Sequence, residues 1–195
     1  MRTLKLLFLL PLVLLLTGCP RCRPVYFNNG PLPEKALAYV PYKDGEVYKF
    51  RHSAGHIIRF TCSRFNQTAQ THCEECCSTV FNYMVNTTWL EPDYPLFNIQ
   101  IDIANPDTSY LYCSAYLGAG FNIPVNPQDT ILAQKTDSVF VDSTWYYDVF
   151  LLKSYPGDFL DLGEIYVDSL YYNYQNGILK IIMSNNETYT IFPDN

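Results

Sequence analysis

The C-terminal third of the chain alternates apolar and polar residues in short runs, and this pattern restricts the fold more than any other feature. Residues 164–173, 177–183 and 187–192 are rich in β-branched and aromatic residues, which favour strands. Asn176-Gly177 separates the first two runs, and Asn185-Asn186 separates the last two. Because Asn-Gly is a strong signal for a two-residue hairpin turn, we predict a three-stranded antiparallel meander.

The rest of the chain predicts further strands and little helix. Ser53-Ala54-Gly55 offers a turn between two runs, so we expect a hairpin there. No long stretch shows helical periodicity, and closely spaced turn signals are typical of sandwiches and barrels. We therefore predict an all-β fold, either an antiparallel β-sandwich or an open barrel or meander. The additional strands are expected at 47–51, 56–62, 78–85, 96–103, 109–117, 138–141 and 145–153.

The N-terminus has the parts of an export signal. Arg2 and Lys5 precede an apolar run from Leu6 to Leu16. This run is about eleven residues long, whereas a membrane-spanning helix needs roughly 20, so we interpret it as a processing segment. Leu16-Thr17-Gly18-Cys19 follows directly and resembles the lipobox of bacterial lipoproteins.

The lipobox resemblance implies a location. It implies cleavage between Gly18 and Cys19, a diacylglycerol such as one carrying palmitate on the Cys19 thiol, and anchoring to a bacterial membrane. The body would then face the periplasm or the cell exterior as an envelope lipoprotein. Several acyl chains anchor a protein stably, whereas one chain is marginal.

The remaining sequence is divided into a lead and a domain. Residues 1–18 are the predicted signal peptide, and their removal leaves 177 of 195 residues. Five prolines and Asn28-Asn29-Gly30 lie in residues 19–43, which we interpret as a Pro-rich tether. Residues 44–195 are the predicted β domain. Aromatic residues make up 16% of the whole chain and charged residues another 16%. This composition is typical of a folded protein.

Charge argues against one class of partner. Losing Arg2 and Lys5 with the signal changes the formal net charge from −6 to about −8. The basic residues gather before residue 65, whereas residues 65–195 are strongly acidic. Nucleic acid is therefore not expected to bind, because phosphate binding needs clustered positive charge.

Six cysteines other than Cys19 are candidates for disulfides, because an exported compartment is oxidising. Six cysteines allow 15 pairings, and the choice stays open, although pairing of Cys62 with the 73–77 cluster across a hairpin is favoured. Thr71-His72-Cys73-Glu74 also fits a capping box, but a strand from Ser78, with the cluster in the preceding loop, is preferred. The candidates are Cys22, Cys62, Cys73, Cys76, Cys77 and Cys113.

The cysteine and histidine residues also offer two other kinds of site. Cys73-x-x-Cys76 has the spacing of half a zinc site, which Cys62, Cys77 or His72 would have to complete, but there is no second Cys-x-x-Cys. His52 and His56 flank a turn, so they are the residues a hydrolase would use. No Gly-x-Ser-x-Gly is present, so no catalytic residue, metal or cofactor is assigned.

The C-terminal region resembles a second group. Ile165-Tyr166, Tyr171-Tyr172-Asn173 and the run Asn176 to Ile181 are similar to the closing hairpin of small uncharacterised lipoproteins from the Bacteroidota, and Trp145 to Phe150 is similar in kind. This resemblance implies a fold and no activity. We therefore expect a non-enzymatic binding or scaffolding module, which contacts the membrane through Cys19 and takes a protein, a glycan or an apolar ligand. The alternatives are the hydrolase and the Cys/His metal site.

Overall fold

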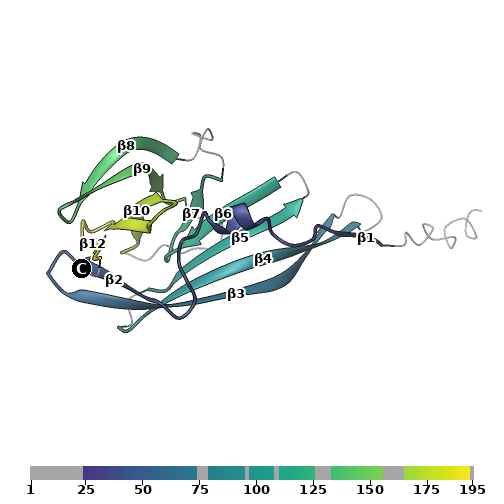
Figure 1. Cartoon of the computed structure of the whole chain (residues 1–195), viewed down its shortest axis with the longest axis horizontal. Helices are drawn as coiled ribbons and strands as arrows, with labels where there is room; N and C mark the ends of the chain where they lie inside the picture. Colours follow the sequence, from purple (N-terminus) through teal and green to yellow (C-terminus); the bar gives the residue numbers. More distant parts are fainter. Residues whose placement is uncertain are drawn as a thin grey trace, which may run out of the picture.

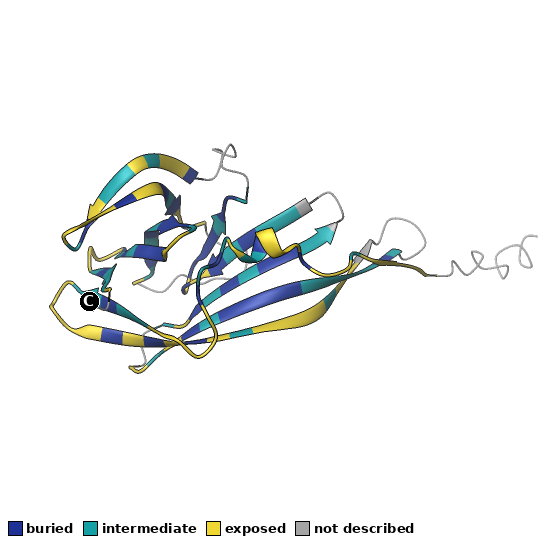
Figure 2. Cartoon of the chain, viewed as in Figure 1, coloured by how far each residue is buried: buried dark blue, intermediate teal, exposed yellow. Residues whose placement is uncertain are grey.

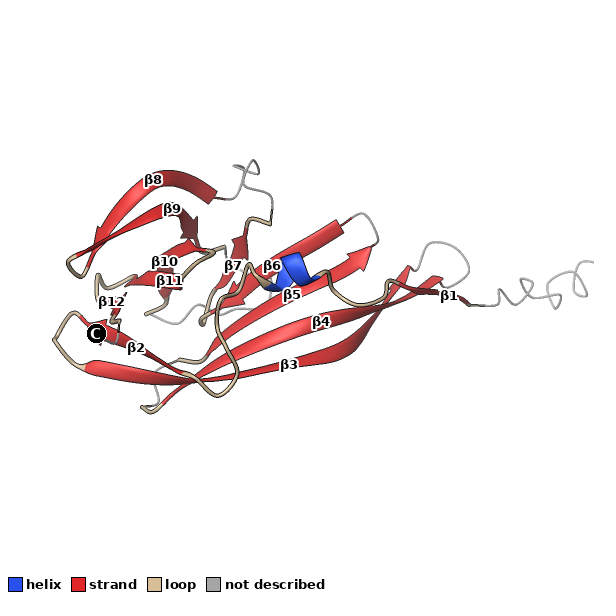
Figure 3. Ribbon diagram, in the orientation of Figure 1, coloured by secondary structure: helices blue, strands red, loops and turns tan. Residues whose placement is uncertain are grey.

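The computed structural model describes residues 24–73, 79–94, 97–107, 110–125, 133–155 and 165–193. Nearly all of this part is β-structure, and a single helical turn, α2 (Glu34–Leu37), interrupts it (Figure 3). The predicted all-β fold class is confirmed. The strands are β1 (Val25–Asn28), β2 (Val47–His52), β3 (Ile57–Cys73), β4 (Thr79–Pro92), β5 (Ile99–Asp107), β6 (Tyr110–Tyr116), β7 (Gly120–Ile123), β8 (Ala133–Val141), β9 (Thr144–Lys153), β10 (Val167–Asn173), β11 (Gly177–Met183) and β12 (Thr188–Ile191).

These strands form one sheet that nearly closes into a barrel (Figure 1). Its order is β7-β6-β5-β4-β3-β2-β12-β11-β10-β9-β8, and every neighbouring pair along this path is antiparallel. Two meanders therefore meet where β2 pairs with β12. A bridge between Gly120 and Tyr155 brings the β7 edge against the chain that follows β9.

The local turn signals gave correct hairpins. β2 and β3 pair across the predicted turn, with Phe50 opposite Ile58. The three C-terminal strands form the predicted meander, with Ile181 paired to both Leu170 and Tyr189. These pairings could be predicted because turn sequences and alternation are properties of adjacent residues.

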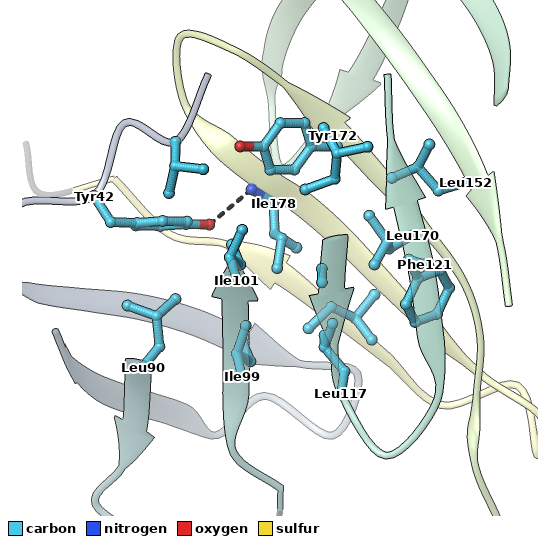
Figure 4. Close-up of a cluster of buried hydrophobic side chains, with 14 of the residues drawn as sticks. Tyr42, Leu90, Ile99, Ile101, Leu117, Phe121, Leu152, Leu170, Tyr172 and Ile178 are labelled. Atoms are coloured by element: carbon cyan, nitrogen blue, oxygen red, sulfur yellow. Dashed lines mark hydrogen bonds between the residues drawn. The ribbon is translucent and has the colours of Figure 1, made fainter. Parts of the chain in front are cut away.

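Alternate side chains fill the inside of the barrel (Figure 4). Ile99, Ile101 and Ile103 of β5 are fully buried, whereas the intervening Gln100 and Asp102 are half-buried. Each large apolar side chain buried in this way stabilises the fold by about 1.5–3 kcal/mol. Figure 2 shows buried residues, in dark blue, along the strands of the sheet.

The β8–β9 hairpin covers the outer face of the C-terminal meander. Val141, Tyr146 and Val149 form a second apolar cluster with Leu179 of β11. The turn of this hairpin is held by an ion pair of 2.6 Å between Asp142 and Arg51 of β2. This covering explains why β10 and β11 bury residues on both faces.

The β3–β4 hairpin is much longer than predicted. Its pairing is continuous from Phe60 opposite Pro92 to Cys73 opposite Thr79, and it projects beyond the barrel (Figure 1). The predicted strand from Ser78 is confirmed as β4, but His72 and Cys73 belong to β3 rather than to a loop. β1 lies parallel to β4 at the projecting end.

Part of the expected tether is packed into the domain. Leu32, Ala36, Val40 and Tyr42 belong to the main core cluster and are at most 9% exposed. An extended lead that lifts the domain off a membrane would leave these side chains in water. The segment from residue 32 to 43 therefore differs from the expectation, because it supplies apolar groups that cover the barrel. Residues 1–23 lie outside the described part.

Within the described ranges, no helix has the length and apolar character needed to cross a membrane.

Candidate functional site

A cleft of about 630 Å³ opens where three turns of the sheet meet. It lies at the end of the β2–β3 turn, after β4 and at the β11–β12 turn, so residues far apart in sequence contribute to it. We call it the distal cleft. Its lining residues are His52, His56, Ile57, Ile58, Asp93, Tyr94, Glu187 and Tyr189.

Backbone bonds hold the two principal turns together. The Ser53 N–H donates to the Thr188 carbonyl at 2.8 Å, and the Thr188 N–H donates to the Ser53 hydroxyl at 3.3 Å. The His52 N–H donates to the His56 carbonyl at 2.8 Å. These bonds give the β2–β3 turn a defined position beside Glu187.

The two histidines lie close together, as their positions around the turn predicted. Their ring centroids are 6.4 Å apart, and the rings are inclined by 14°. His52 Nδ1 accepts a bond of 3.2 Å from the Ala54 N–H. His52 Nε2 lies 3.9 Å from a carboxylate oxygen of Glu187. The turn and the carboxylate therefore set the orientation of this imidazole.

Two carboxylates supply negative charge to the cleft. Asp93 is positioned by a reciprocal pair: its N–H donates to the Arg59 carbonyl at 2.9 Å, and its side chain accepts from the Arg59 N–H at 3.2 Å. Glu187 comes from the turn between β11 and β12. Burial, and then the nearby Glu187 charge, raise the pKa of Tyr189. The cleft thus presents hydrogen-bond acceptors and repels anions.

Apolar surface accompanies these polar groups. Tyr94 is 63% exposed and Ile57 is 40% exposed, so both offer contact area to a ligand. Tyr189 is buried below them and packs edge-on against Phe97 at a centroid distance of 5.3 Å. A smaller hollow of about 340 Å³ shares Glu187 and Tyr189 and reaches Leu117 and Met183.

The β2–β3 turn, which lines the distal cleft, and β1 lie at opposite ends of the molecule (Figure 1). β1 pairs with residues 79–82 of β4, which pair in turn with residues 70–73 of β3. Ile57 in the cleft begins β3. At about 3.3 Å per residue, the strand between them spans about 45–50 Å. The hairpin therefore separates the cleft from the end of the domain that follows Cys19.

The structure shows no disulfide among the cysteines that it describes. Cys62 and Cys113 are buried free thiols. Cys62 and Cys73 lie eleven residues apart on one strand, about 36 Å at the usual rise, whereas a disulfide needs Cα atoms within about 7 Å. Pairing of Cys62 with Cys73 is therefore wrong. Cys19, Cys22, Cys76 and Cys77 lie outside the described residues.

The same geometry removes Cys62 from the alternative metal site. Among the described side chains, no group of three His, Cys, Asp or Glu residues is arranged to hold a metal ion. Burial, followed by the nearby Asp44 charge, raises the pKa of Cys62 to about 11. Burial likewise raises the pKa of Cys113. Neutral thiols are poor metal ligands and poor nucleophiles.

The hydrolase alternative requires a histidine between a carboxylate and a nucleophilic hydroxyl. His52 has the carboxylate of Glu187 on one side. Its other ring nitrogen accepts from the Ala54 N–H, so it does not face a hydroxyl, and the Ser53 hydroxyl accepts from Thr188. The described residues therefore do not assemble a nucleophile–base pair around His52.

The sequence predicted the proximity of the two histidines of the distal cleft but not the carboxylates and aromatic residues that join them. Asp93 and Glu187 are 94 positions apart in the sequence and meet only through the strand order of the sheet. The Asn185-Asn186 turn was predicted, and it is the single local signal that placed Glu187 near a strand end.

Comparisons with known proteins give no relative: no protein-family model matches the chain, and no curated protein and no solved structure matches it.

Proposed function

We propose that this protein is a lipid-anchored envelope lipoprotein that binds an uncharged glycan in the distal cleft. The combination of exposed Tyr94 with two carboxylates, Asp93 and Glu187, carries the proposal. An aromatic ring offers a flat apolar face to the C–H groups of a sugar. Carboxylates accept hydrogen bonds from sugar hydroxyls.

The charge of the distal cleft selects among ligands. Asp93 and Glu187 disfavour phosphates, nucleotides and acidic sugars by repulsion. The cleft is open and partly polar, so it suits a hydroxylated ligand better than a lipid. The interior of the barrel is occupied by side chains such as Phe121, Leu152 and Tyr172 (Figure 4), which favours surface binding over carriage of an apolar molecule.

The anchor part of the proposal rests on the lipobox-like Leu16-Thr17-Gly18-Cys19. The long β3–β4 hairpin supports it, because the hairpin places the distal cleft far from β1 and so away from an anchor at Cys19. A binding site at the membrane-distal end is reachable by a polymer outside the membrane. The protein would then act on the periplasmic or outer side.

Glycan binding is tested with the mature protein purified in detergent. We expect calorimetry with neutral glucan, mannan, xylan and N-acetylglucosamine oligomers to detect binding to one of them, with little binding to a polyuronate. Tyr94→Ala and Glu187→Gln should each weaken binding by about fivefold to tenfold. Tyr116→Ala is the matched control, because Tyr116 is 44% exposed outside the cleft. Binding that neither cleft variant alters would refute the site.

The anchor is tested by feeding expressing cells with labelled palmitate. Label should enter the chain, and the intact mass should match cleavage before an acylated Cys19. Cys19→Ala should abolish labelling, whereas Cys22→Ala should leave it unchanged. Labelling that persists in Cys19→Ala would show that the anchor is elsewhere.

A further inference from the structure

β1 exposes three consecutive apolar or aromatic side chains. Val25, Tyr26 and Phe27 are 51%, 64% and 48% exposed. Phe27 stacks on Phe81 of β4 with ring centroids 5.3 Å apart. A contiguous group of exposed aromatic residues marks an interaction surface more often than a scattered single residue does. We call these four residues the β1 patch.

The β1 patch has a defined position on the domain. β1 is parallel to β4, with Phe27 opposite Phe81. The Asn29 N–H donates to the Asn82 carbonyl at 3.0 Å, and the Asn29 side-chain amide donates to the Asn105 carbonyl at 2.8 Å. The aromatic residues are therefore presented by a paired strand, whose placement these bonds reinforce.

The chain length before β1 limits what can cover the patch. Val25 follows Cys19 by six positions, and an extended chain spans at most about 3.6 Å per residue. An acylated Cys19 would therefore hold Val25 within about 22 Å of the membrane surface. Tyrosine is enriched at the headgroup level, where its ring is in apolar surroundings and its hydroxyl is hydrated.

We infer that the β1 patch docks into the headgroup layer of the membrane that anchors Cys19. The acyl chains supply most of the attachment, and the β1 patch restricts the orientation of the domain. With β1 on the membrane, the β3–β4 hairpin points the distal cleft outward. This inference rests on the proposed anchor and is independent of the ligand in the cleft.

A fluorescent reporter tests the inference on the mature acylated protein in phosphatidylethanolamine–phosphatidylglycerol vesicles. Trp89 and Trp145 are replaced by Phe, and Phe27→Trp supplies the reporter. We expect blue-shifted emission that brominated lipids quench by at least twofold. The matched control is Phe65→Trp in the same background, because Phe65 is 46% exposed on β3, and it should not be quenched.

The unaltered protein provides a second readout if the tryptophan-free background does not fold. Vesicles with a diazirine-bearing phospholipid should cross-link to peptides containing residues 24–30 and not to peptides of β8. Absence of quenching and cross-linking at β1 in acylated protein would overturn the inference. Emission that shifts with protein concentration and is not quenched by lipid would also overturn it, because a second copy would then cover the edge. A missing acyl mass would instead refute the anchor.

Discussion

The hydroxyl oxygen of Tyr42 accepts a hydrogen bond of 2.8 Å from the backbone N–H of Ile178, across 136 positions of sequence (Figure 4). Tyr42 is 1% exposed, and burial raises its pKa. This contact joins the segment before β2 to the penultimate strand. It makes residues 32–43 part of the domain, and it suggests how the stability of that segment can be measured.

Tyr42→Phe should destabilise the protein by about 1–3 kcal/mol, because the Ile178 N–H would remain buried without a partner. Urea unfolding followed by circular dichroism measures this change as a lower midpoint with an unchanged slope. Tyr116→Phe removes a hydroxyl from an exposed tyrosine and should have little effect. Equal effects of the two variants would contradict the role of the bond.

Gly177→Ala should destabilise the protein more than Gly55→Ala. Both glycines have positive φ, +76° and +91°, so both variants lose the backbone freedom of glycine. A Cβ at Gly177 would lie 2.5 Å from the Tyr42 ring, whereas one at Gly55 meets nothing within 4 Å. We expect an additional loss of about 1–3 kcal/mol from overpacking. Equal unfolding midpoints for the two variants, by heat or by urea, would show that the Tyr42 ring moves aside without loss of stability.

Arg64→Met should loosen residues 32–43 from the barrel. The Arg64 guanidinium donates to the carbonyls of Leu37, Val40 and Tyr42, each at 3.0 Å. Bonds from a charged donor contribute about 1.5–3 kcal/mol each at most, so a total loss of about 2–4 kcal/mol is expected. Limited trypsin digestion should then cleave after Lys35 and Lys43 several times faster.

Two variants complete the Arg64 experiment. Arg59→Met alters an exposed arginine of the same strand and should leave digestion unchanged. Arg64→Lys should rescue only partly, because one ammonium cannot reach several carbonyls as the planar guanidinium does. Full rescue by lysine would show that charge alone matters.

Cys62 should resist alkylation in the native protein. Burial raises its pKa to about 11, and the thiolate is the reactive form. At pH 8 we expect iodoacetamide to modify Cys62 at least tenfold faster in urea than in buffer, as read by peptide mass spectrometry. Cys113 should behave likewise, because it is also buried. Rapid native modification of either would place that thiol at the surface.

Alkaline pH should destabilise the fold. Burial raises the pKa of Cys62 to about 11 and that of Tyr48 to about 12, so folding favours their neutral forms. Their contribution is complete below the ordinary pKa of each group and is lost as pH rises through the raised values. Urea midpoints should therefore fall between about pH 9 and 12. In Cys62→Ala the urea midpoint should fall less steeply with pH. An unchanged fall would show that the tyrosines, and not Cys62, cause the loss of stability.

The sequence predicted the hairpins from local turn residues, but it did not predict how the segment before β2 packs. The β2–β3 hairpin and the C-terminal meander were predicted because Asn176-Gly177 and the 53–55 turn act locally. The packing of residues 32–43 was missed because prolines in this segment are compatible with both a free lead and a covering segment. The Arg64 guanidinium, the Ile178 N–H and the core side chains decide between these, and they lie far away in sequence.

The sequence by itself determined the all-β class and the short hairpins, because alternation and turn chemistry are properties of adjacent residues. The tertiary structure alone decided that Cys62 and Cys73 are far apart and that Asp93 and Glu187 share a cleft with His52. The physical reason is strand pairing: the 17-residue β3 separates groups that are near in sequence, and the pairing of β2 with β12 joins groups that are far apart.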